Sequence, residues 1–419
     1  MDRRNIEKAL VQVIRNQGSA GVDGMQTDEL RDYLNANYQS LRRSVVAGSY
    51  QPSPVRKVEI PKPQGGKRML GIPTALDRLL QQAISQWLNQ FYELDFSKHS
   101  YGFRPKRNGH QAVLQARSFL NEGKVWVVEM DLEKFFDKVN HDRLMYLLSK
   151  RVTDKGTLHL IHQYLRSGIM EGGLVSQRTE GTPQGSPLSP LLSNIILDEL
   201  DRELVHRGHS FVRYADDCSI YVKSEKAAQR VLQNITTYIE GKLLLKVNRD
   251  KSKVSRPTES YLLGFSFFRS KEQWEIRIAA KSMKRIREKC KTITSRNNGQ
   301  SLQQKLSKLK PVIQGWLNYF QIAQAKSTLT KLDAYVRARL RAGLWRDWKN
   351  CRTRIRNLLH LGASKQKSYE WGNTSKGYWR TAHSPILQTT LNNRYFSKKG
   401  YVGFLTPYMR KSEMQPPLF

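Results

Sequence analysis

The most informative run of residues in this chain reads Ser210-Phe211-Val212-Arg213-Tyr214-Ala215-Asp216-Asp217-Cys218-Ser219-Ile220-Tyr221-Val222. Two adjacent carboxylates, Asp216 and Asp217, lie between two short runs that are rich in aromatic and β-branched residues. Such runs are typical of β-strands, and the polar pair between them is typical of a tight turn. Aspartates are also common in turns because they hydrogen-bond nearby backbone, so the pair alone most often has a structural role.

A third carboxylate changes the interpretation of this hairpin. The run Val125-Trp126-Val127-Val128-Glu129-Met130-Asp131 is largely apolar and ends in an aspartate, as expected of a buried strand that ends at a functional edge. If this strand lies beside the hairpin, Asp131, Asp216 and Asp217 converge. Three close carboxylates repel one another unless cations lie between them, and oxygen ligands suit Mg²⁺. Two Mg²⁺ ions about 4 Å apart would activate an attacking hydroxyl group and stabilise a leaving pyrophosphate.

Length and charge point to a protein of two or three domains that binds a polyanion. The chain has 419 residues, a formal net charge of +35 and a pI near 10.2, far from what solubility requires. The excess is uneven, because residues 275–419 hold 30 Lys and Arg against 6 Asp and Glu and so supply +24 of the +35. Charge alone indicates a nucleic-acid partner but no chemistry, since ribosomal and chromatin proteins are equally basic.

Cysteine usage and hydropathy favour an intracellular protein. Cys218, Cys290 and Cys351 are far apart and form no Cys-x-x-Cys pair, which argues against structural zinc and against a disulfide framework. No apolar run approaches 18 residues, and the N-terminus lacks a signal-peptide core. We therefore expect a soluble protein with no membrane partner.

The first third of the chain predicts helices followed by a β-hairpin. Apolar residues recur with helical spacing in residues 1–50, on both sides of a loop over 16–24 that contains three glycines. Alternating residues on both sides of Gly65-Gly66 then predict a hairpin, which presents Lys62 and Arg68. These cations either grip a triphosphate or form an ordinary solvated surface.

Several further segments have both a structural and a functional interpretation. An amphipathic helix is predicted over 74–91, and Arg104 in Ser100-Tyr101-Gly102-Phe103-Arg104-Pro105 either contacts a phosphate or pairs with a buried acid. His141 is a possible base, but its place beside an Asn140 or Asp142 helix cap is the simpler interpretation. The loop Gly181-Thr182-Pro183-Gln184-Gly185-Ser186-Pro187-Leu188-Ser189-Pro190 precedes another amphipathic helix.

From residue 280 the pattern becomes helical and basic. Three apolar stripes with helical spacing run over 283–293, 302–320 and 329–348, and Pro311 is expected to kink or restart the second. The opposite faces carry cations, which suits the phosphates and minor groove of an RNA–DNA duplex; coiled-coil pairing is the alternative. Beyond about residue 350, aromatic residues alternate with cations, as in Lys376-Gly377-Tyr378-Trp379-Arg380, which favours binding of single-stranded or structured nucleic acid over a merely solvated surface.

These stretches together resemble a reverse transcriptase, and within that group the protein encoded by a bacterial group II intron. The resemblance implies an α+β right-hand polymerase, with fingers and palm built on antiparallel sheet, then a helical thumb and a small C-terminal domain. Its expected segments are an N-terminal extension (1–50), reverse transcriptase fingers and palm (51–274), a thumb or maturase domain (275–350) and a DNA-binding domain (351–419).

The resemblance also assigns roles at the carboxylates. Asp131 and Asp216 would hold two Mg²⁺ ions with help from the backbone carbonyl of Leu132, and Mn²⁺ would substitute. Asp217 would support the site. The enzyme would be an RNA-directed DNA polymerase in which a primer 3′-hydroxyl attacks a deoxynucleotide.

The same resemblance predicts which residues contact the incoming dNTP. They are Lys62, Arg68, Phe136, Gln184 and Lys251. Phe136 would lie under the sugar and exclude a 2′-hydroxyl. Lys251, or alternatively Lys253, would protonate the departing pyrophosphate. The same resemblance favours a contact between Arg104 and a phosphate near the template over pairing of Arg104 with a buried acid.

The expected partners are an RNA template, a DNA or RNA primer, group II intron RNA and target DNA, all in the bacterial cytoplasm. Binding of the intron RNA would make the chain a maturase that assists splicing and retroelement mobility. No Cys/His cluster follows residue 350, which suggests the class C branch without an endonuclease domain. Ser186 replaces the second glycine typical of the family's Pro-Gln-Gly loop. Two alternatives stay open: an RNA-folding cofactor with a vestigial polymerase site, and an active enzyme that serves the host in phage defence or repair.

Overall fold

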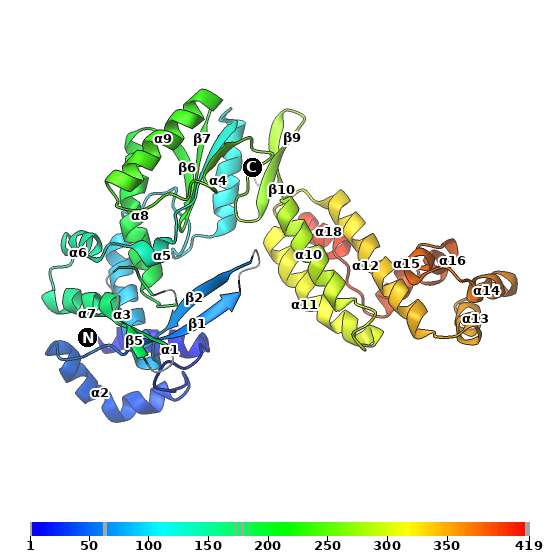
Figure 1. Cartoon of the computed structure of the whole chain (residues 1–419), viewed down its shortest axis with the longest axis horizontal. Coiled ribbons are helices and arrows are strands. Elements are labelled where there is room, and N and C mark those ends of the chain that lie inside the picture. Colours follow the sequence, from blue (N-terminus) through cyan, green and yellow to red (C-terminus); the bar gives the residue numbers. More distant parts are fainter. Residues whose placement is uncertain (1, 62–64, 172–173, 177–179, 184, 415–419) are drawn as a thin grey trace. The chain divides into compact units, whose positions relative to one another are not determined.

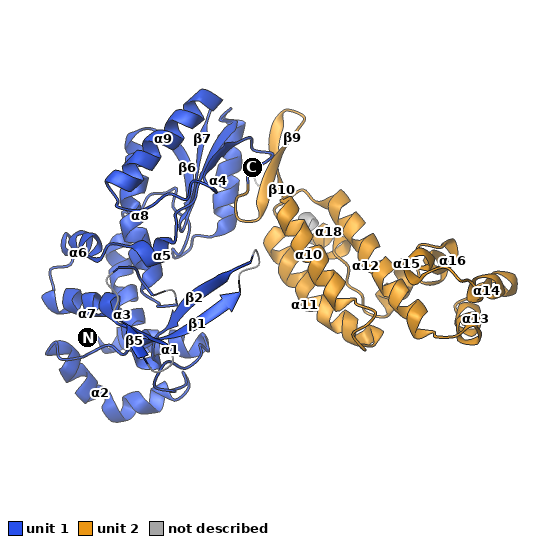
Figure 2. Ribbon diagram, viewed as in Figure 1, with its two compact units in different colours: residues 1–260 blue, residues 261–419 orange. Residues whose placement is uncertain are grey.

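The computed structural model describes residues 2–61, 65–171, 174–176, 180–183 and 185–414. The chain folds into two compact units, residues 1–260 and 261–419 (Figure 2). The four functional segments proposed from the sequence remain a prediction, because compactness alone does not assign function. In the part that the structure describes, no helix is both long and apolar enough to span a bilayer.

The centre of the first unit is a four-stranded sheet in the order β6-β7-β3-β8. Its strands are β6 (Ser210–Tyr214), β7 (Asp217–Val222), β3 (Trp126–Met130) and β8 (Lys253–Ser255). All neighbouring pairs are antiparallel, and Val128 of the central strand is paired with Ile220 on one side and Val254 on the other. The predicted hairpin and the predicted strand before Asp131 are therefore confirmed as neighbours.

Helices cover both faces of this sheet, which explains why its strands are almost continuously apolar. On one face the core includes Val128, Ile220 and the buried side of α9 (Glu225–Gly241) and α8 (Ser189–His206). On the opposite face Tyr221 contacts Phe119 of α4 (Gly109–Asn121), with ring centroids 5.7 Å apart. Figure 1 shows α9 and α4 on the two sides of the strands.

A second sheet of the first unit is built around the predicted hairpin and has the order β2-β1-β4-β5. Its strands are β1 (Val55–Pro61), β2 (Lys67–Ile72), β4 (Ile169–Glu171) and β5 (Leu174–Ser176). β1 and β2 are antiparallel, with Ile60 opposite Arg68, so the hairpin prediction is confirmed. β1 also pairs with β4 in parallel.

The remaining helices of the first unit pack around these sheets. They are α1 (Arg3–Arg15), α2 (Leu30–Val46), α3 (Ala75–Tyr92), α5 (Phe135–Lys138), α6 (His141–Ser149) and α7 (Lys155–Arg166). Asp2 caps α1 by accepting a hydrogen bond from the backbone N of Arg4, and the buried residues Ile6, Leu10 and Val13 follow at helical spacing. They share a core with Leu34 of α2 and with α3.

The second unit begins with the hairpin β9 (Phe265–Ser270) and β10 (Gln273–Ile278) and is otherwise helical. Its long helices are α10 (Ala280–Ile293), α11 (Leu302–Phe320) and α12 (Lys326–Asp347), followed by α13 (Cys351–His360), α14 (Lys365–Gly372), α15 (Tyr378–Ala382), α16 (Pro385–Thr390), α17 (Asn393–Lys398) and α18 (Leu405–Met414). The three predicted stripes match α10, α11 and α12. α11 runs through Pro311 as one helix, so the restart is excluded, and the kink stays a prediction.

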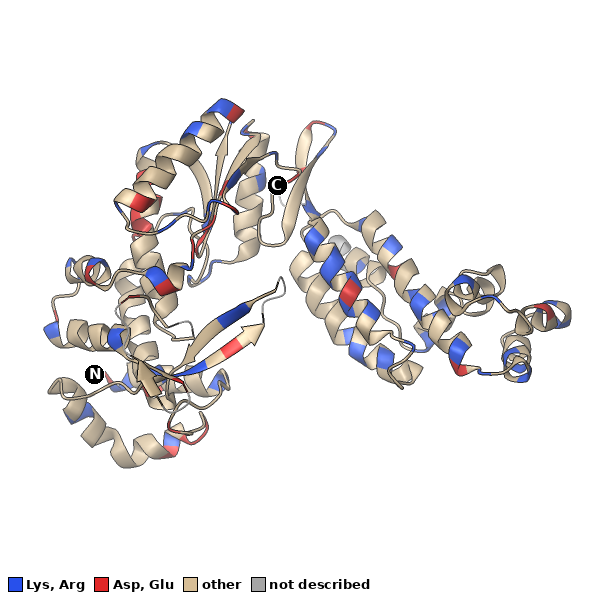
Figure 3. Cartoon of the chain, viewed as in Figure 1, with Lys and Arg blue, Asp and Glu red and all other residues tan. Residues whose placement is uncertain are grey.

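The end of the chain packs back onto the long helices of its own unit. Asp333 on α12 is buried and accepts hydrogen bonds from the Tyr401 hydroxyl group (2.8 Å) and from the backbone N atoms of Phe404 (2.9 Å) and Leu405 (2.9 Å). These bonds satisfy a carboxylate that burial would otherwise make costly. Lys and Arg recur along α10 and α12 (Figure 3). The α+β class with a helical segment after the sheets is thus confirmed.

Candidate active site

The paired aspartates lie at the turn between β6 and β7. Tyr214 pairs with Asp217, which leaves Ala215 and Asp216 as the two-residue loop. Asp131 directly follows β3, whose last residue Met130 pairs with Cys218. Because β3 and β7 are antiparallel neighbours, Asp131, Asp216 and Asp217 come to the same edge of the sheet, although they are far apart in sequence.

Burial and mutual repulsion act on the carboxylates of Asp216 and Asp217. Burial, followed by repulsion from Asp131, raises the pKa of Asp216 above its usual value. Burial of the carboxyl group and repulsion from Asp216 and Asp131 raise the pKa of Asp217 to about 6, although the residue still reaches the surface. Neighbouring negative charge therefore makes Asp216 and Asp217 harder to ionise.

Lysine side chains lie beside this edge. Lys251 Nζ is 3.0 Å from Asp131 Oδ2, and Lys253 Nζ is 3.7 Å from Glu129 Oε2. The Asp131 backbone is fixed to the same loop, since its N donates to Ser252 Oγ (3.0 Å) and its O accepts from the N of Asn248 (2.8 Å). Of the two candidate lysines, Lys251 is the one in contact with a predicted catalytic carboxylate.

The donor atoms at this edge fit a divalent cation held by a small ligand set. Among the described residues, no group of three or more His, Cys, Asp or Glu side chains is arranged around a single ion position. The predicted ligands are fewer: the carboxylates of Asp131 and Asp216 and the carbonyl of Leu132. These are hard oxygen donors, and a divalent cation between the two carboxylates would relieve the repulsion that raises the pKa of Asp216.

The predicted nucleotide contacts are only partly placed. Arg68 on β2 is exposed, and its positive charge lowers the pKa of Asp216 against the larger effect of burial, which puts it in electrostatic reach of the turn. Phe136 on α5 is half-buried, with its ring 5.3 Å from that of Phe135. Lys62 and Gln184 lie outside the described residues.

The described residues on either side of Gln184 are hydrogen-bonded to α3 and to the segment that contains α5. The backbone N atoms of Gly181 and Thr182 donate to the carbonyl oxygens of Val139 (2.8 Å) and Phe136 (2.6 Å). The Ser186 hydroxyl group donates to Gln81 Oε1 on α3 at 2.6 Å, and both residues are buried. The serine that replaces the family's second glycine therefore anchors this loop to the helix below it.

A buried arginine, which was not among the residues predicted from the sequence, holds the turn in place. Arg213 has no exposed surface; its Nε and Nη2 donate to the Asp201 carboxylate at 2.7 and 2.6 Å. Its Nη1 donates to Asn194 Oδ1 (2.9 Å) and to the carbonyl oxygen of Ala215 (3.0 Å). The signal in the sequence was a cation within the otherwise apolar strand Phe211-Val212-Arg213.

The turn itself has a strained backbone. Ala215 has φ +57°, a left-handed conformation that non-glycine residues rarely adopt. A Cβ atom on Gly102 would lie 2.2 Å from the backbone N of Ala215, so only glycine fits at this contact. Asn194 Nδ2 donates to the Gly102 carbonyl oxygen at 3.0 Å. A strained conformation of this kind persists only where the surrounding structure enforces it. Here the conformation of Ala215 places Asp216 at the apex of the β6–β7 turn.

Two further sequence interpretations are resolved. The preferred phosphate contact of Arg104 was wrong, because its side chain is 3% exposed and its guanidinium binds Glu93 (2.9 Å) and the carbonyl oxygens of Ser97 and Ser100. Asn140 caps α6 and the adjacent His141 contacts the Gly181 carbonyl oxygen at 2.7 Å, in line with the simpler interpretation.

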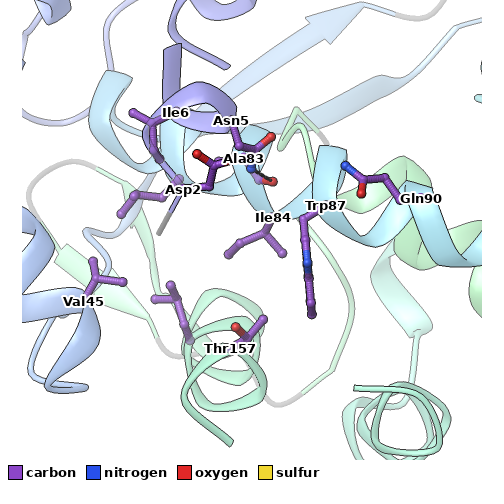
Figure 4. A pocket seen from close by; sticks show the side chains of 11 residues that line it. Asp2, Asn5, Ile6, Val45, Ala83, Ile84, Trp87, Gln90 and Thr157 are labelled. Atoms are coloured by element: carbon purple, nitrogen blue, oxygen red, sulfur yellow. Dashed lines mark hydrogen bonds between the residues drawn. The ribbon is translucent and has the colours of Figure 1, made fainter. Parts of the chain in front are cut away.

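The first unit also has a pocket of about 430 Å³ between α1, α2, α3 and α7 (Figure 4). Ile84 and Trp87 form part of its apolar wall, and Asp2 and Asn5 lie on the α1 side. Of the predicted catalytic and nucleotide-contacting residues that the structure describes, none lines it. It is a gap in the packing of the N-terminal helices and not part of the site built on Asp131 and Asp216.

The sequence matches two known families over the segments that carry these features. Residues 60–267 match the family described as "Reverse transcriptase (RNA-dependent DNA polymerase)". Residues 283–362 match "Group II intron, maturase-specific domain". The first match includes β3, the β6–β7 hairpin and all three carboxylates, so the class of protein is a reverse transcriptase, an RNA-directed DNA polymerase.

Individual relatives narrow this class. "Protein YkfC" of Escherichia coli K12 is 34% identical over 300 residues, which cover 62% of this chain and 79% of that protein. "Group II intron-encoded protein LtrA" of Lactococcus lactis is 34% identical over 212 residues, 50% of this chain and 35% of that protein. "Putative COX1/OXI3 intron 2 protein" of Saccharomyces cerevisiae is 29% identical over 287 residues, 54% of this chain and 34% of that protein. The chain therefore spans only about a third of the last two.

With a reverse transcriptase segment followed by a maturase-specific segment, the chain belongs to the family of group II intron-encoded reverse transcriptases. The resemblance inferred from the sequence is thereby confirmed. Reverse transcriptases as a family use divalent metal ions and bind nucleic-acid templates.

Proposed function

We propose that this chain extends a DNA or RNA primer on an RNA template. The primer 3′-hydroxyl attacks the α-phosphate of a bound dNTP, the new phosphodiester bond forms, and pyrophosphate leaves. The observation that carries the proposal is the meeting of Asp131, Asp216 and Asp217 at one sheet edge, where their repulsion contributes to the raised pKa values of Asp216 and Asp217. Two Mg²⁺ ions, with Mn²⁺ as a substitute, would activate the hydroxyl group and neutralise phosphate charge there.

The residues around this edge have separate tasks in the proposal. Asp131, Asp216 and the Leu132 carbonyl would hold the ions, and Asp217 would maintain the negative potential. The Lys251 ammonium group, 3.0 Å from Asp131, is placed to give a proton to the leaving pyrophosphate. Arg68 offsets the charge of the triphosphate. Lys62 and Gln184 complete the predicted nucleotide contacts, and Phe136 lies under the sugar.

Intron RNA and target DNA are the proposed macromolecular partners beyond template and primer. Support comes from the match of residues 283–362 to the maturase-specific family and from the charge of the second unit. Many phosphate contacts make affinity fall steeply as the salt concentration rises. Binding of the intron RNA would make the chain a splicing cofactor as well as a polymerase.

Extension of oligo(dT) on poly(rA) tests the polymerase proposal. Labelled dTTP should be incorporated in the presence of Mg²⁺, and incorporation should stop when EDTA is added. Failure to extend with either Mg²⁺ or Mn²⁺, by protein that still binds the primer–template, would contradict the proposal and leave an RNA-folding role.

Gly102→Ala should slow extension at least about tenfold. The added Cβ atom would lie 2.2 Å from the backbone N of Ala215, and backbone cannot yield as a flexible side chain can, so the turn with Asp216 must shift. Gly156→Ala is the matched control, because its Cβ atom would meet Asp154 Oδ2 at 3.7 Å, an ordinary contact. Equal extension rates for the two variants would show that the turn does not depend on this close approach.

Stability without divalent metal should depend on the charge of Asp217. Its pKa is raised from 3.8 to about 6, so the folded chain binds this proton more tightly than the unfolded chain. The resulting stabilisation is complete below about pH 3.8 and is lost as the pH rises through about 6. The urea midpoint of Asp217→Asn minus that of wild type should therefore be larger at pH 7.5 than at pH 4.5. A constant difference across this range would refute the coupling.

A further inference from the structure

The second unit contains a cationic pocket of about 740 Å³. It lies between α10, α12 and the segment that runs from Trp379 to Arg394. Five of its lining residues are cations and none is acidic; the cations are Arg287, Lys331, Arg337, Arg341 and Arg394. Residues three or four apart share one face of a helix, so Lys331, Ala334, Arg337 and Arg341 form the α12 wall. Such a concentration of one charge sign attracts an anion.

Arg341 makes the charge of this pocket costly in the absence of an anion. Only 7% of the residue is exposed, and its Nε donates to the Leu391 carbonyl oxygen at 2.9 Å. Burial and the neighbouring charge of Arg337 lower the pKa of Arg341 to about 10. Asp333, an acid of the same helix, is engaged by Tyr401, Phe404 and Leu405. An anion in the pocket would offset both the burial and the repulsion.

One wall of the pocket is aromatic. The rings of Trp379 and Tyr335 are 6.0 Å apart in an edge-to-face arrangement, and Trp379 meets His383 in the same way at 4.8 Å. The Arg287 guanidinium lies over the Tyr335 ring, 4.3 Å from its centroid. Trp379 remains 44% exposed, so part of this apolar side chain is accessible next to the cations.

Phosphate-binding charge and a flat aromatic surface in one pocket match the two halves of a nucleotide. The volume lies within the range of small-molecule sites, about 300–1,000 Å³. A base within a duplex offers no free face for stacking, whereas an unpaired base can be displaced and stacked on an aromatic side chain. Gln388 and Asn393 also line the pocket. Gln388 Nε2 donates to the His383 carbonyl oxygen at 2.8 Å, so the Gln388 carbonyl oxygen and the Asn393 amide are the groups that can bind a base edge.

We propose that this pocket binds one unpaired nucleotide displaced from a nucleic acid, with its base on Trp379 and its phosphate among Arg337, Arg341 and Arg394. This inference rests on the proposed nucleic-acid binding of the second unit and adds a structural preference to it. A pocket of this kind makes bulged or looped strands better ligands than fully paired strands. The donor strand is RNA or DNA, since both offer the same base and phosphate.

Binding of matched hairpins tests the aromatic half of the pocket. Fluorescent RNA and DNA hairpins, each fully paired or with one unpaired nucleotide, are titrated with the full chain. Wild type should prefer the bulged form about tenfold, as one stacked base provides, and the preferred sugar type identifies the donor strand. Trp379→Leu should lose this preference. Tyr369→Leu, which removes another exposed aromatic residue outside the pocket lining, should retain it.

A charge-matched comparison tests the other half. Arg337→Gln/Arg394→Gln and Lys365→Gln/Lys367→Gln each remove two cations from the second unit, so both should weaken binding to paired hairpins to a similar extent. Only the first pair should also abolish the preference for the bulge. In addition, a 5-iodouracil at the bulge of the wild-type ligand should cross-link to the peptide that contains Trp379.

Three outcomes would overturn the inference: equal binding of bulged and paired hairpins by wild type, an unchanged preference in Trp379→Leu, or loss of the preference in both charge variants alike. Extension of oligo(dT) on poly(rA) is measured on the same wild-type preparation. Extension without a bulge preference would refute the pocket and leave the polymerase standing. A bulge preference without extension would refute the polymerase and support the pocket.

Discussion

Asp216→Asn is expected to reduce primer extension at least about 1,000-fold, which corresponds to about 4 kcal/mol of lost transition-state stabilisation. The substitution keeps the shape of the side chain and removes its charge. Asp216 lies at the apex of the turn, where Asp131 and Arg68 both act on its pKa. A neutral amide binds a divalent ion poorly, so the attacking hydroxyl group and the leaving pyrophosphate would lose their main stabilisation.

The matched control is Asp142→Asn, which neutralises an exposed aspartate in the first turn of α6. Its extension rate should stay near that of wild type. Affinity for the primer–template should be similar for both variants. The lower extension rate of Asp216→Asn then reflects the chemical step and not a folding defect. An Asp216→Asn enzyme that retains a tenth of the wild-type rate would be incompatible with a role for this carboxylate in metal binding.

Arg213→Met is expected to destabilise the first unit by about 3–5 kcal/mol, because it leaves the buried Asp201 carboxylate without its partner. Both side chains are fully buried, and the closest contact between them is 2.6 Å. In this variant three acceptors also lose the hydrogen bonds that Arg213 donates: Asn194 Oδ1, Ser100 Oγ (2.8 Å) and the carbonyl oxygen of Ala215. Urea unfolding of the folded, metal-free chain measures this loss.

Two further variants separate charge from packing. Arg213→Met/Asp201→Leu should recover part of the stability, because no buried charge is then left uncompensated. Arg31→Met breaks the exposed pair with Glu7, whose side chains are 48% and 55% exposed, and should cost less than about 1 kcal/mol. If Arg213→Met unfolded within about 1 kcal/mol of wild type, the turn could not owe its position to this network.

Patterns local in sequence predicted the site most successfully. The run that ends at Asp131 and the hairpin around Asp216 are short, apolar and bounded by polar residues, so their strands could be predicted directly, and their pairing brought the carboxylates together. The hairpin of β1 and β2 was equally clear from Gly65-Gly66. In each case the information lies within about ten consecutive residues, where strand periodicity and turn chemistry act.

Contacts between distant segments could not be predicted in the same way. Arg104 was assigned to phosphate because nothing in the sequence placed Glu93 beside it, whereas in the folded chain the two form a partly buried ion pair. The Arg213 network joins strand β6 to Ser100 and to α8, and the Ser186–Gln81 bond spans 105 positions. Such contacts depend on tertiary packing. A local residue pattern does not show which distant residue will lie beside a given side chain.

The central claim is that Asp131 and Asp216 together hold catalytic divalent ions. Electron paramagnetic resonance can measure Mn²⁺ binding to the enzyme in the presence of dNTP and a primer that ends in a dideoxynucleotide. This measurement tests the claim without requiring turnover. Wild type should bind Mn²⁺ that both Asp131→Asn and Asp216→Asn fail to bind at the same free concentration. Equal Mn²⁺ binding by all three proteins would contradict the claim.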